Sequence, residues 1–475
     1  MKKYILLLSV LIPCMGLVSC KKFLEERART EVIPKTAESL NELLLGEGYP
    51  RISISIQPFF LDDDKEQKAL IPGIKASFYT FTWQPDQEFN LVGSNLRLGP
   101  WQLYYKCIQI CNVALDYSEK VSGTPEEKDN VRGQAHLLRA LYYFKLVNFY
   151  AKPFTDSRSN PDQDPGVPLM LSSGVSTEGK TRNTVKEVYA QITKDLVDGI
   201  DELERSKKNG GPYRISSLAG HLLASRVYLH MGAWEKAIAS ATVALQNKYN
   251  IADLNSWGPP GQELKSVVSA NNPETLWAFG NQSDVTFNDL DFSNYQLSPE
   301  LLGLFEKGDL RTTIYFNGKN LLKRARKGSQ ELKVAHALRI SEALLNRAEA
   351  YARLNKAGDA GAGNLAIADL NSLRKKRFST EYYADWVYSN AADLLQKCFA
   401  EKRREFAWEE EHRWFDLRRQ EMPKISHYFY ENANLRLRYD LLDHDPAYLL
   451  QIPQEALKLN TKLTDNPKPA LRVGK

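Results

Sequence analysis

The sequence is poor in the residues from which catalytic and metal centres are built. Its 475 residues include seven scattered histidines and five cysteines. Neither the H-E-x-x-H spacing of zinc-binding helices nor the G-x-S-x-G turn of serine hydrolases occurs. Glycosidase carboxylates need not be close in sequence, but no pattern selects a pair of them. We therefore predict a protein that is not an enzyme and holds no metal and no cofactor.

The cysteines are also too few and too irregularly spaced for a disulfide framework. Beyond the N-terminal leader, and besides Cys20, they stand at Cys107, Cys111 and Cys398. Cys107 and Cys111 lie on one face of a helical pattern, where a disulfide has poor geometry and no further metal ligand stands nearby. We predict buried free thiols.

The chain lacks both a charge excess and a long hydrophobic run. Its net charge of +5 falls to +3 without Lys2 and Lys3, which gives no electrostatic basis for binding nucleic acid. The apolar stretch Tyr4–Ile12 is too short to span a bilayer. Following a basic start, it indicates a signal peptide over residues 1–19.

A lipid anchor is predicted directly after this leader. Leu17-Val18-Ser19-Cys20 matches the lipobox of bacterial lipoproteins, in which the cysteine becomes the acylated first residue. Cys14 competes, but Pro13 suits cleavage poorly, and a plain secretory signal is the alternative. Two lysines follow in place of the Asp that commonly retains lipoproteins at the inner membrane. We predict a single mature domain, 20–475, anchored through acylated Cys20 to the outer membrane and exposed at the cell surface.

What the sequence does contain is helical periodicity. Apolar residues recur at three- and four-residue steps in Trp101–Leu115 and Leu137–Val147. Further helical patterns run over 184–203, 217–231, 234–246, 335–354, 365–377 and 391–419. The pair from His221 to Leu245 has alanines at the packing positions of a tetratricopeptide unit. We predict a mainly α fold of tetratricopeptide-like helical repeats, which bury their apolar faces by stacking.

Long loops rich in Gly, Pro, Asn and Asp separate these helices, at 151–166, 254–273 and 280–298. Loops of such length are commonly functional. We predict a loop-rich insert over about 254–316, in which Trp277 lies in an apolar run and belongs to the core.

One phosphate-binding pattern is present, since Gly174–Thr181 matches G-x-x-x-x-G-K-[ST]. In a P-loop the lysine opens the helix whose amides hold the phosphates. Here Thr184-Val185-Lys186-Glu187 is a capping box that starts the helix later. The alternating strands and helices of a nucleotide-binding sheet are also absent. We predict that Lys180 binds no nucleotide.

Two charged segments have structural interpretations. Asp62-Asp63-Asp64 lacks the spacing and glycine of a calcium loop, and we predict a solvated turn. Glu405, Glu409, Arg413 and Asp416 recur at helical steps. They predict one helical face whose charges pair with one another in a structural network, rather than an active site.

Several separated segments resemble the SusD/RagB family and run in its order across almost the whole mature chain. Cys20-Lys21-Lys22-Phe23-Leu24-Glu25 is similar to its lipidated start, and Gly133–Phe144 to its most recognisable helix. Further similar segments are Trp101–Tyr104, Pro168-Leu169, Leu338–Ala350, Leu370–Arg374, Glu401–Arg419, Ile452-Pro453 and Asn466-Pro467. Ala151-Lys152-Pro153 departs from the family's usual Gly-bearing turn. The resemblance implies the SusD-like fold.

The resemblance also implies a function. Such proteins bind an oligosaccharide, or less often a peptide, at the cell surface and deliver it without catalysis to a TonB-dependent transporter of the SusC/RagA type. The expected partners are therefore that transporter, the glycan and the membrane, and not nucleic acid. A surface glycan hydrolase is the alternative from another class, and a repeat scaffold without a ligand is the third.

The ligand contacts are expected on the loops that flank the repeats. Sugar rings stack on exposed aromatic planes, while their hydroxyls need amide and carboxylate partners. We predict planes from Trp83, Trp257, Phe287 and Tyr295, and hydrogen bonds from Asn281, Gln282, Asn288 and Asp289.

Overall fold

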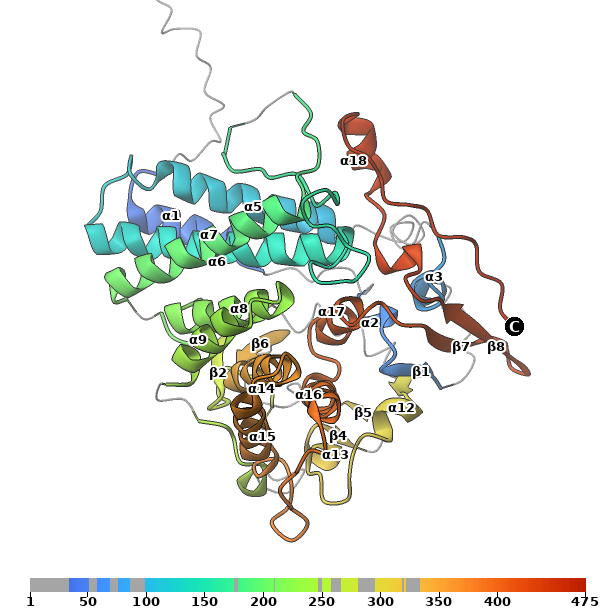
Figure 1. The fold of residues 1–475 in the computed structure, drawn as a ribbon. Coiled ribbons are helices and arrows are strands. Elements are labelled where there is room, and N and C mark those ends of the chain that lie inside the picture. The colour runs from blue at the N-terminus through green and yellow to red at the C-terminus, as the bar shows by residue number, and fades with distance from the viewer. Residues whose placement is uncertain are drawn as a thin grey trace, which may run out of the picture.

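The structure is a computed structural model that describes most of the chain. The described residues are 34–50, 58–68, 76–85, 99–174, 178–208, 210–246, 250–257, 266–280, 295–317, 320–321 and 334–475. Helices dominate them (Figure 1), as the periodicity predicted. The predicted leader and Cys20 lie outside the described residues.

The first helical group forms one layer, at the upper left of Figure 1. It consists of α1 (Ala37–Leu43), the π-helical turn η1 (Leu44–Gly48), α5 (Pro100–Tyr117), α6 (Pro125–Tyr150) and α7 (Val185–Ser206). The centre of this layer is α6, which is buried at every position from Leu137 to Tyr150. Gly133 and Gly199 let α6 and α7 approach closely, because a Cβ on either would lie 2.9 Å from the carbonyl oxygen of the other.

The second group contains the helix pair that we predicted as tetratricopeptide-like. It consists of α8 (Ser217–His230), α9 (Trp234–Leu245), α14 (Ile340–Lys356), α15 (Ala360–Arg374) and α16 (Ala391–Phe406). Ala237 and Ala244 are fully buried, and Ala237 packs with Leu229 and Ala350. These small side chains allow α9 to pack between α8 and α14, so the predicted role of the alanines is confirmed.

The strands form two-stranded antiparallel ladders. Their pairs are β1 (Lys65–Gln67) with β3 (Tyr295–Leu297), β2 (Thr275–Phe279) with β6 (His336–Arg339), β4 (Phe316–Asn317) with β5 (Asn320–Leu321), and β7 (Ile425–Asn432) with β8 (Leu435–Leu441). Trp277 is fully buried in β2, as predicted. Short helical turns complete the fold: α2 (Pro58–Leu61), α3 (Ala76–Phe81), η2 (Leu254–Ser256), α12 (Pro299–Leu302), α13 (Arg311–Ile314), α17 (His412–Arg419), η3 (Pro446–Tyr448) and α18 (Gln454–Leu459).

The start of α7 confirms the interpretation of the phosphate-binding pattern. Thr184 is the N-cap, and its side chain and that of Glu187 form the predicted capping box. Lys180 lies four residues earlier, and its ammonium donates to the carbonyl oxygen of Leu169 at 3.1 Å. The lysine is therefore part of a loop and not of a helix N-terminus.

Cys107, Cys111 and Cys398 are buried and free, as predicted. Burial raises the pKa of the Cys107 thiol to about 11, so this thiol stays protonated and unreactive near neutral pH. Across the ranges given above, no helix combines the length and the apolar character that crossing a bilayer requires.

Candidate functional site

Trp257 is the predicted ligand contact that the structure places at the surface. It follows η2, and its side chain is half-buried against the core. The turn is attached to the segment after α15, because the backbone N–H of Leu254 donates to the carbonyl oxygen of Lys376 at 2.9 Å. The Lys376 ammonium in turn lies 2.9 Å from the Asp253 carboxylate. A partly exposed indole on an anchored turn provides the plane that stacking on a sugar requires.

Trp83 does not provide the exposed plane that we expected, because it is fully buried. Its indole N–H donates to the carbonyl oxygen of Leu61 at 2.9 Å, and its ring stacks on His427 at 4.1 Å between centroids. The backbone of Trp83 has a left-handed φ of 50°, which turns the ring inward after α3. The side chain of Trp83 therefore packs the end of α3 against β7.

Tyr295 is likewise in the core rather than on a loop surface. It opens β3, where it pairs with Gln67, and it is 2% exposed. Its ring lies 4.9 Å from that of Phe60 and 5.0 Å from that of Phe81. The remaining predicted contacts lie outside the described residues, and they are Asn281, Gln282, Phe287, Asn288 and Asp289.

The acidic run at 62–64 is not the solvated turn that we predicted. Asp64 is fully buried, and its carboxylate lies 2.6 Å from the Arg403 guanidinium. Asp63 pairs with Arg413 at 2.6 Å. The basic groups that pair with Asp63 and Asp64 belong to α16 and α17, more than three hundred residues later, so the burial of these carboxylates has no local signal.

The charged block 401–419 is also not one continuous helix. α16 ends at Phe406, and α17 begins at His412. Between them Trp408 and Glu410 adopt left-handed φ values of 61° and 42°. The break lets the acidic groups of 409–411 reach partners on other elements; Glu410, for example, lies 2.6 Å from Lys145 of α6.

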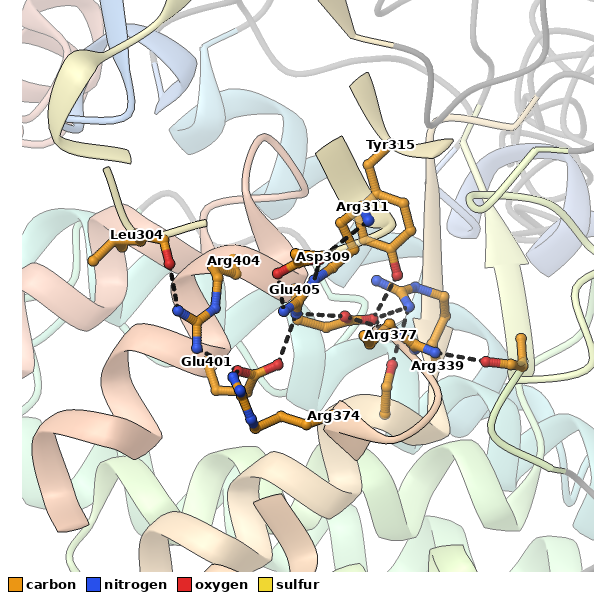
Figure 2. A network of polar contacts seen from close by, with 12 residues as sticks. Leu304, Asp309, Arg311, Tyr315, Arg339, Arg374, Arg377, Glu401, Arg404 and Glu405 are labelled. Atoms are coloured by element: carbon orange, nitrogen blue, oxygen red, sulfur yellow. Dashed lines mark hydrogen bonds and ion pairs between the residues drawn. The ribbon is translucent and has the colours of Figure 1, made fainter. Parts of the chain in front are cut away.

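The ion-pair network that we predicted is present, but its partners come from elsewhere in the fold. Figure 2 shows Glu405 surrounded by guanidinium groups. Its carboxylate lies 2.8 Å from Arg339 of β6, 2.9 Å from Arg377 beyond α15, and 3.3 Å from Arg311 of α13. The Tyr315 hydroxyl donates to it at 2.9 Å. Glu405 thus links four segments of the chain.

The carboxylates of this network are held ionised. Burial alone would raise the pKa of Glu401, but Arg311, Arg404 and Arg374 outweigh burial and lower it to about 2. The pKa of Glu405 is held well below its usual range in the same way, by Arg377 and Arg339. A carboxylate saturated by fixed cations has no free oxygen for proton transfer, so the cluster has the chemistry of a structural junction.

A second buried charge cluster encloses a small polar cavity. Lys145, Arg226 and Glu410 line it together with His230, Lys402, Glu411, His412, Phe415 and Asp416. The Arg226 guanidinium lies 2.5 Å from Glu342 and 3.3 Å from Glu410. The cavity has room for about one water molecule. It is too small for a sugar.

Comparison with known families settles what the chain is. Residues 56–229 match a family model described as "Starch-binding associating with outer membrane", and residues 303–468 match that of the SusD family. The two models lie in the order that the motifs predicted. The chain belongs to the SusD/RagB family. No curated protein matches the sequence.

Solved structures of SusD-like proteins share this fold over nearly their whole length. A SusD-like carbohydrate binding protein from Bacteroides vulgatus is 20% identical and has a TM-score of 0.71, with 90% of this chain and 98% of that chain covered. A SusD superfamily protein from Bacteroides thetaiotaomicron also gives 20% and 0.71, with coverage of 91% and 100%. A putative sugar binding protein from Bacteroides vulgatus gives 20% and 0.70, with coverage of 92% and 99%.

The SusD/RagB family consists of binding proteins without catalytic activity, so family membership confirms the prediction that the chain is not an enzyme. The two buried charge clusters therefore hold SusD-type helices and ladders together. Sequence reasoning missed the basic partners Arg311, Arg339 and Arg377, because single arginines in separate elements carry no spacing signal. The helical spacing of charges in 401–419 pointed to the acidic half of the network alone.

Proposed function

We propose that this protein binds an oligosaccharide at the cell surface and delivers it to a partner TonB-dependent transporter of the SusC/RagA type. Family membership supports the proposal, since one matching model is described as starch-binding and outer-membrane-associated. Structural neighbours described as carbohydrate binding and sugar binding support it as well. The observation that carries it is Trp257, a partly exposed indole on a turn anchored to the end of α15.

The proposed ligand site extends from Trp257 into the insert that follows it. Asn281, Gln282, Asn288 and Asp289 are the proposed partners for sugar hydroxyls, and Phe287 is a second plane. Trp83 and Tyr295 act indirectly in this proposal, because Trp83 packs on His427 of β7 and Tyr295 belongs to the β1–β3 ladder. A peptide ligand in place of a glycan is the alternative within the family, and displacement of bound glycan by peptides would reveal it.

Replacing Trp257 with Ala should weaken glycan binding by about 1–3 kcal/mol, as expected for an aromatic anchor. The melting temperature should change little, because the side chain is only half-buried. The measurement is calorimetric titration with an oligosaccharide selected on a glycan array. Trp234→Ala is the matched control, since Trp234 is also half-buried but opens α9 on the repeat surface. Equal affinities of the two variants would place the site elsewhere.

The membrane attachment of the protein is proposed to depend on Cys20. Two acyl chains give stable anchoring, whereas a single chain gives only marginal binding. Cys20→Ser should therefore move the protein from the outer-membrane fraction to the soluble fraction. Cys14→Ser is the control, and it should leave the distribution unchanged. Full membrane retention of the Cys20 variant would rule out the anchor.

A further inference from the structure

Three loops that are far apart in the sequence meet beside the start of the β7–β8 hairpin. Asp156 lies in the loop after α6, Glu421 in the turn after α17, and His444 in the loop after β8. Each brings one ligand atom to a common point, and these atoms lie within 4.8 Å of one another. Nε2 of His444 is 3.0 Å from Oδ2 of Asp156 and 3.8 Å from Oε2 of Glu421.

The imidazole is oriented from behind by a fourth residue. Nδ1 of His444 lies 3.0 Å from Oδ2 of Asp443. When Nδ1–H donates to that carboxylate, Nε2 carries the lone pair and faces the two other carboxylates. A carboxylate behind a histidine is the arrangement that fixes metal-binding imidazoles. A lone pair that faces carboxylate oxygens at this distance is repelled unless a proton or a metal cation lies between them.

Further hydrogen bonds hold the two carboxylates toward the same point. The backbone N–H of Arg158 donates to Oδ1 of Asp156 at 2.9 Å, which leaves Oδ2 facing His444. The backbone N–H of Ser157 donates to Oε2 of Glu421 at 3.2 Å. In a tetrahedral zinc site, bonds of about 2.0–2.1 Å place neighbouring ligand atoms about 3.4 Å apart. The separations from His444 of 3.0 and 3.8 Å lie on either side of that value.

The ligand types at this point fit a divalent cation, because the carboxylates of Asp156 and Glu421 supply two negative charges. Positive charge nearby partly opposes the ion: Arg158 pairs with Asp443 at 3.2 Å, and buried Arg418, which donates to the carbonyl oxygen of Ala151, lies within electrostatic range of Asp156. One imidazole with two carboxylates suits Zn²⁺, whereas Ca²⁺ takes six to eight oxygen ligands.

We propose that Asp156, Glu421 and His444 bind a transition-metal ion of the Zn²⁺ class, with Asp443 orienting the imidazole. The Glu421 side chain is 52% exposed, which gives the ion an entry path and leaves a fourth position open to water. The bound ion would join three loops that backbone hydrogen bonds connect only partly, such as that from His444 N–H to Met422 at 2.9 Å. This proposal departs from the prediction of no metal, which rested on spacing along the sequence.

The test is calorimetric titration of the purified full-length protein with Zn²⁺ in detergent solution. The wild-type protein should bind one ion and gain melting temperature. His444→Asn should lose the binding, because Asn tolerates the left-handed φ of 51° at this position but removes the imidazole. Asp443→Asn should weaken binding about 10–100-fold. Glu421→Gln, at a side chain that is 52% exposed, should also weaken binding.

His221→Asn is the matched control. His221 stands beside Glu204 at 3.3 Å on the surface of α8, where it represents adventitious binding, and its variant should bind like the wild type. A wild-type protein without saturable Zn²⁺ binding would overturn the proposal. So would equal binding by the wild type and the Glu421 and His444 variants, or displacement of Zn²⁺ by equimolar Ca²⁺.

Discussion

Replacing Glu405 with Gln should lower the free energy of unfolding by about 3–5 kcal/mol, the cost of removing one partner from a buried ion pair. Gln has the same shape but no charge, so Arg339 and Arg377 would remain buried with part of their countercharge removed. Both guanidinium groups are fully buried, so water cannot replace the lost carboxylate. Denaturant unfolding of the purified variant measures the loss.

Glu300→Gln provides the matched control for this change. Glu300 is an exposed side chain in the first turn of α12, and neutralising it should change stability by less than about 0.5 kcal/mol. A loss of under about 1 kcal/mol for the Glu405 variant would show that Glu401 and Glu409 compensate. The network would then be redundant, and Glu405 would not be its centre.

Replacing Trp83 with Ala should destabilise the fold by about 3–5 kcal/mol, the usual cost of truncating a buried Trp. The indole is fully buried, stacks on His427 and donates a hydrogen bond to the Leu61 backbone. Its removal would leave a cavity between α3 and β7 and an unpaired carbonyl oxygen. Thermal unfolding followed by circular dichroism gives the measurement.

The comparison with Trp257→Ala separates stability from binding. The Trp83 variant should lose melting temperature, and any loss of glycan binding should disappear at temperatures where the variant is folded. The Trp257 variant should instead keep its melting temperature and lose glycan affinity. If Trp83→Ala keeps wild-type stability but binds glycan weakly, the indole would be a direct contact, and the burial seen here would not describe the bound state.

The local elements could be predicted from the sequence because their signals lie within a few residues. Capping boxes fix where helices start, as at Thr184, through hydrogen bonds between neighbours three residues apart. Apolar residues at helical spacing identify buried faces such as that of α6. The core position of Trp277 and the buried thiols followed from the same local patterns. The order of family motifs supplied the fold, which the family models and solved structures confirm.

The sequence alone could not predict which single aromatic residues are exposed to solvent. Trp83 and Tyr295 stand in loop-like segments, and the structure buries both because distant partners cover them. His427 covers Trp83 from β7, and Phe60 and Phe81 cover Tyr295. Aromatic residues in loops have the same local pattern whether they face solvent or the core.

By itself, the sequence determined most of the helices, the capped start of α7, the family and the dense charge of 401–419. Only the tertiary structure decided which charges meet. Glu405 is linked to three arginines, Asp63 to Arg413, and Asp156 to His444, each across a long separation in the chain. The physical reason is that a helix or a cap is stabilised by neighbours along the chain. A buried ion pair or a metal site instead depends on distances that exist only once the whole chain has packed.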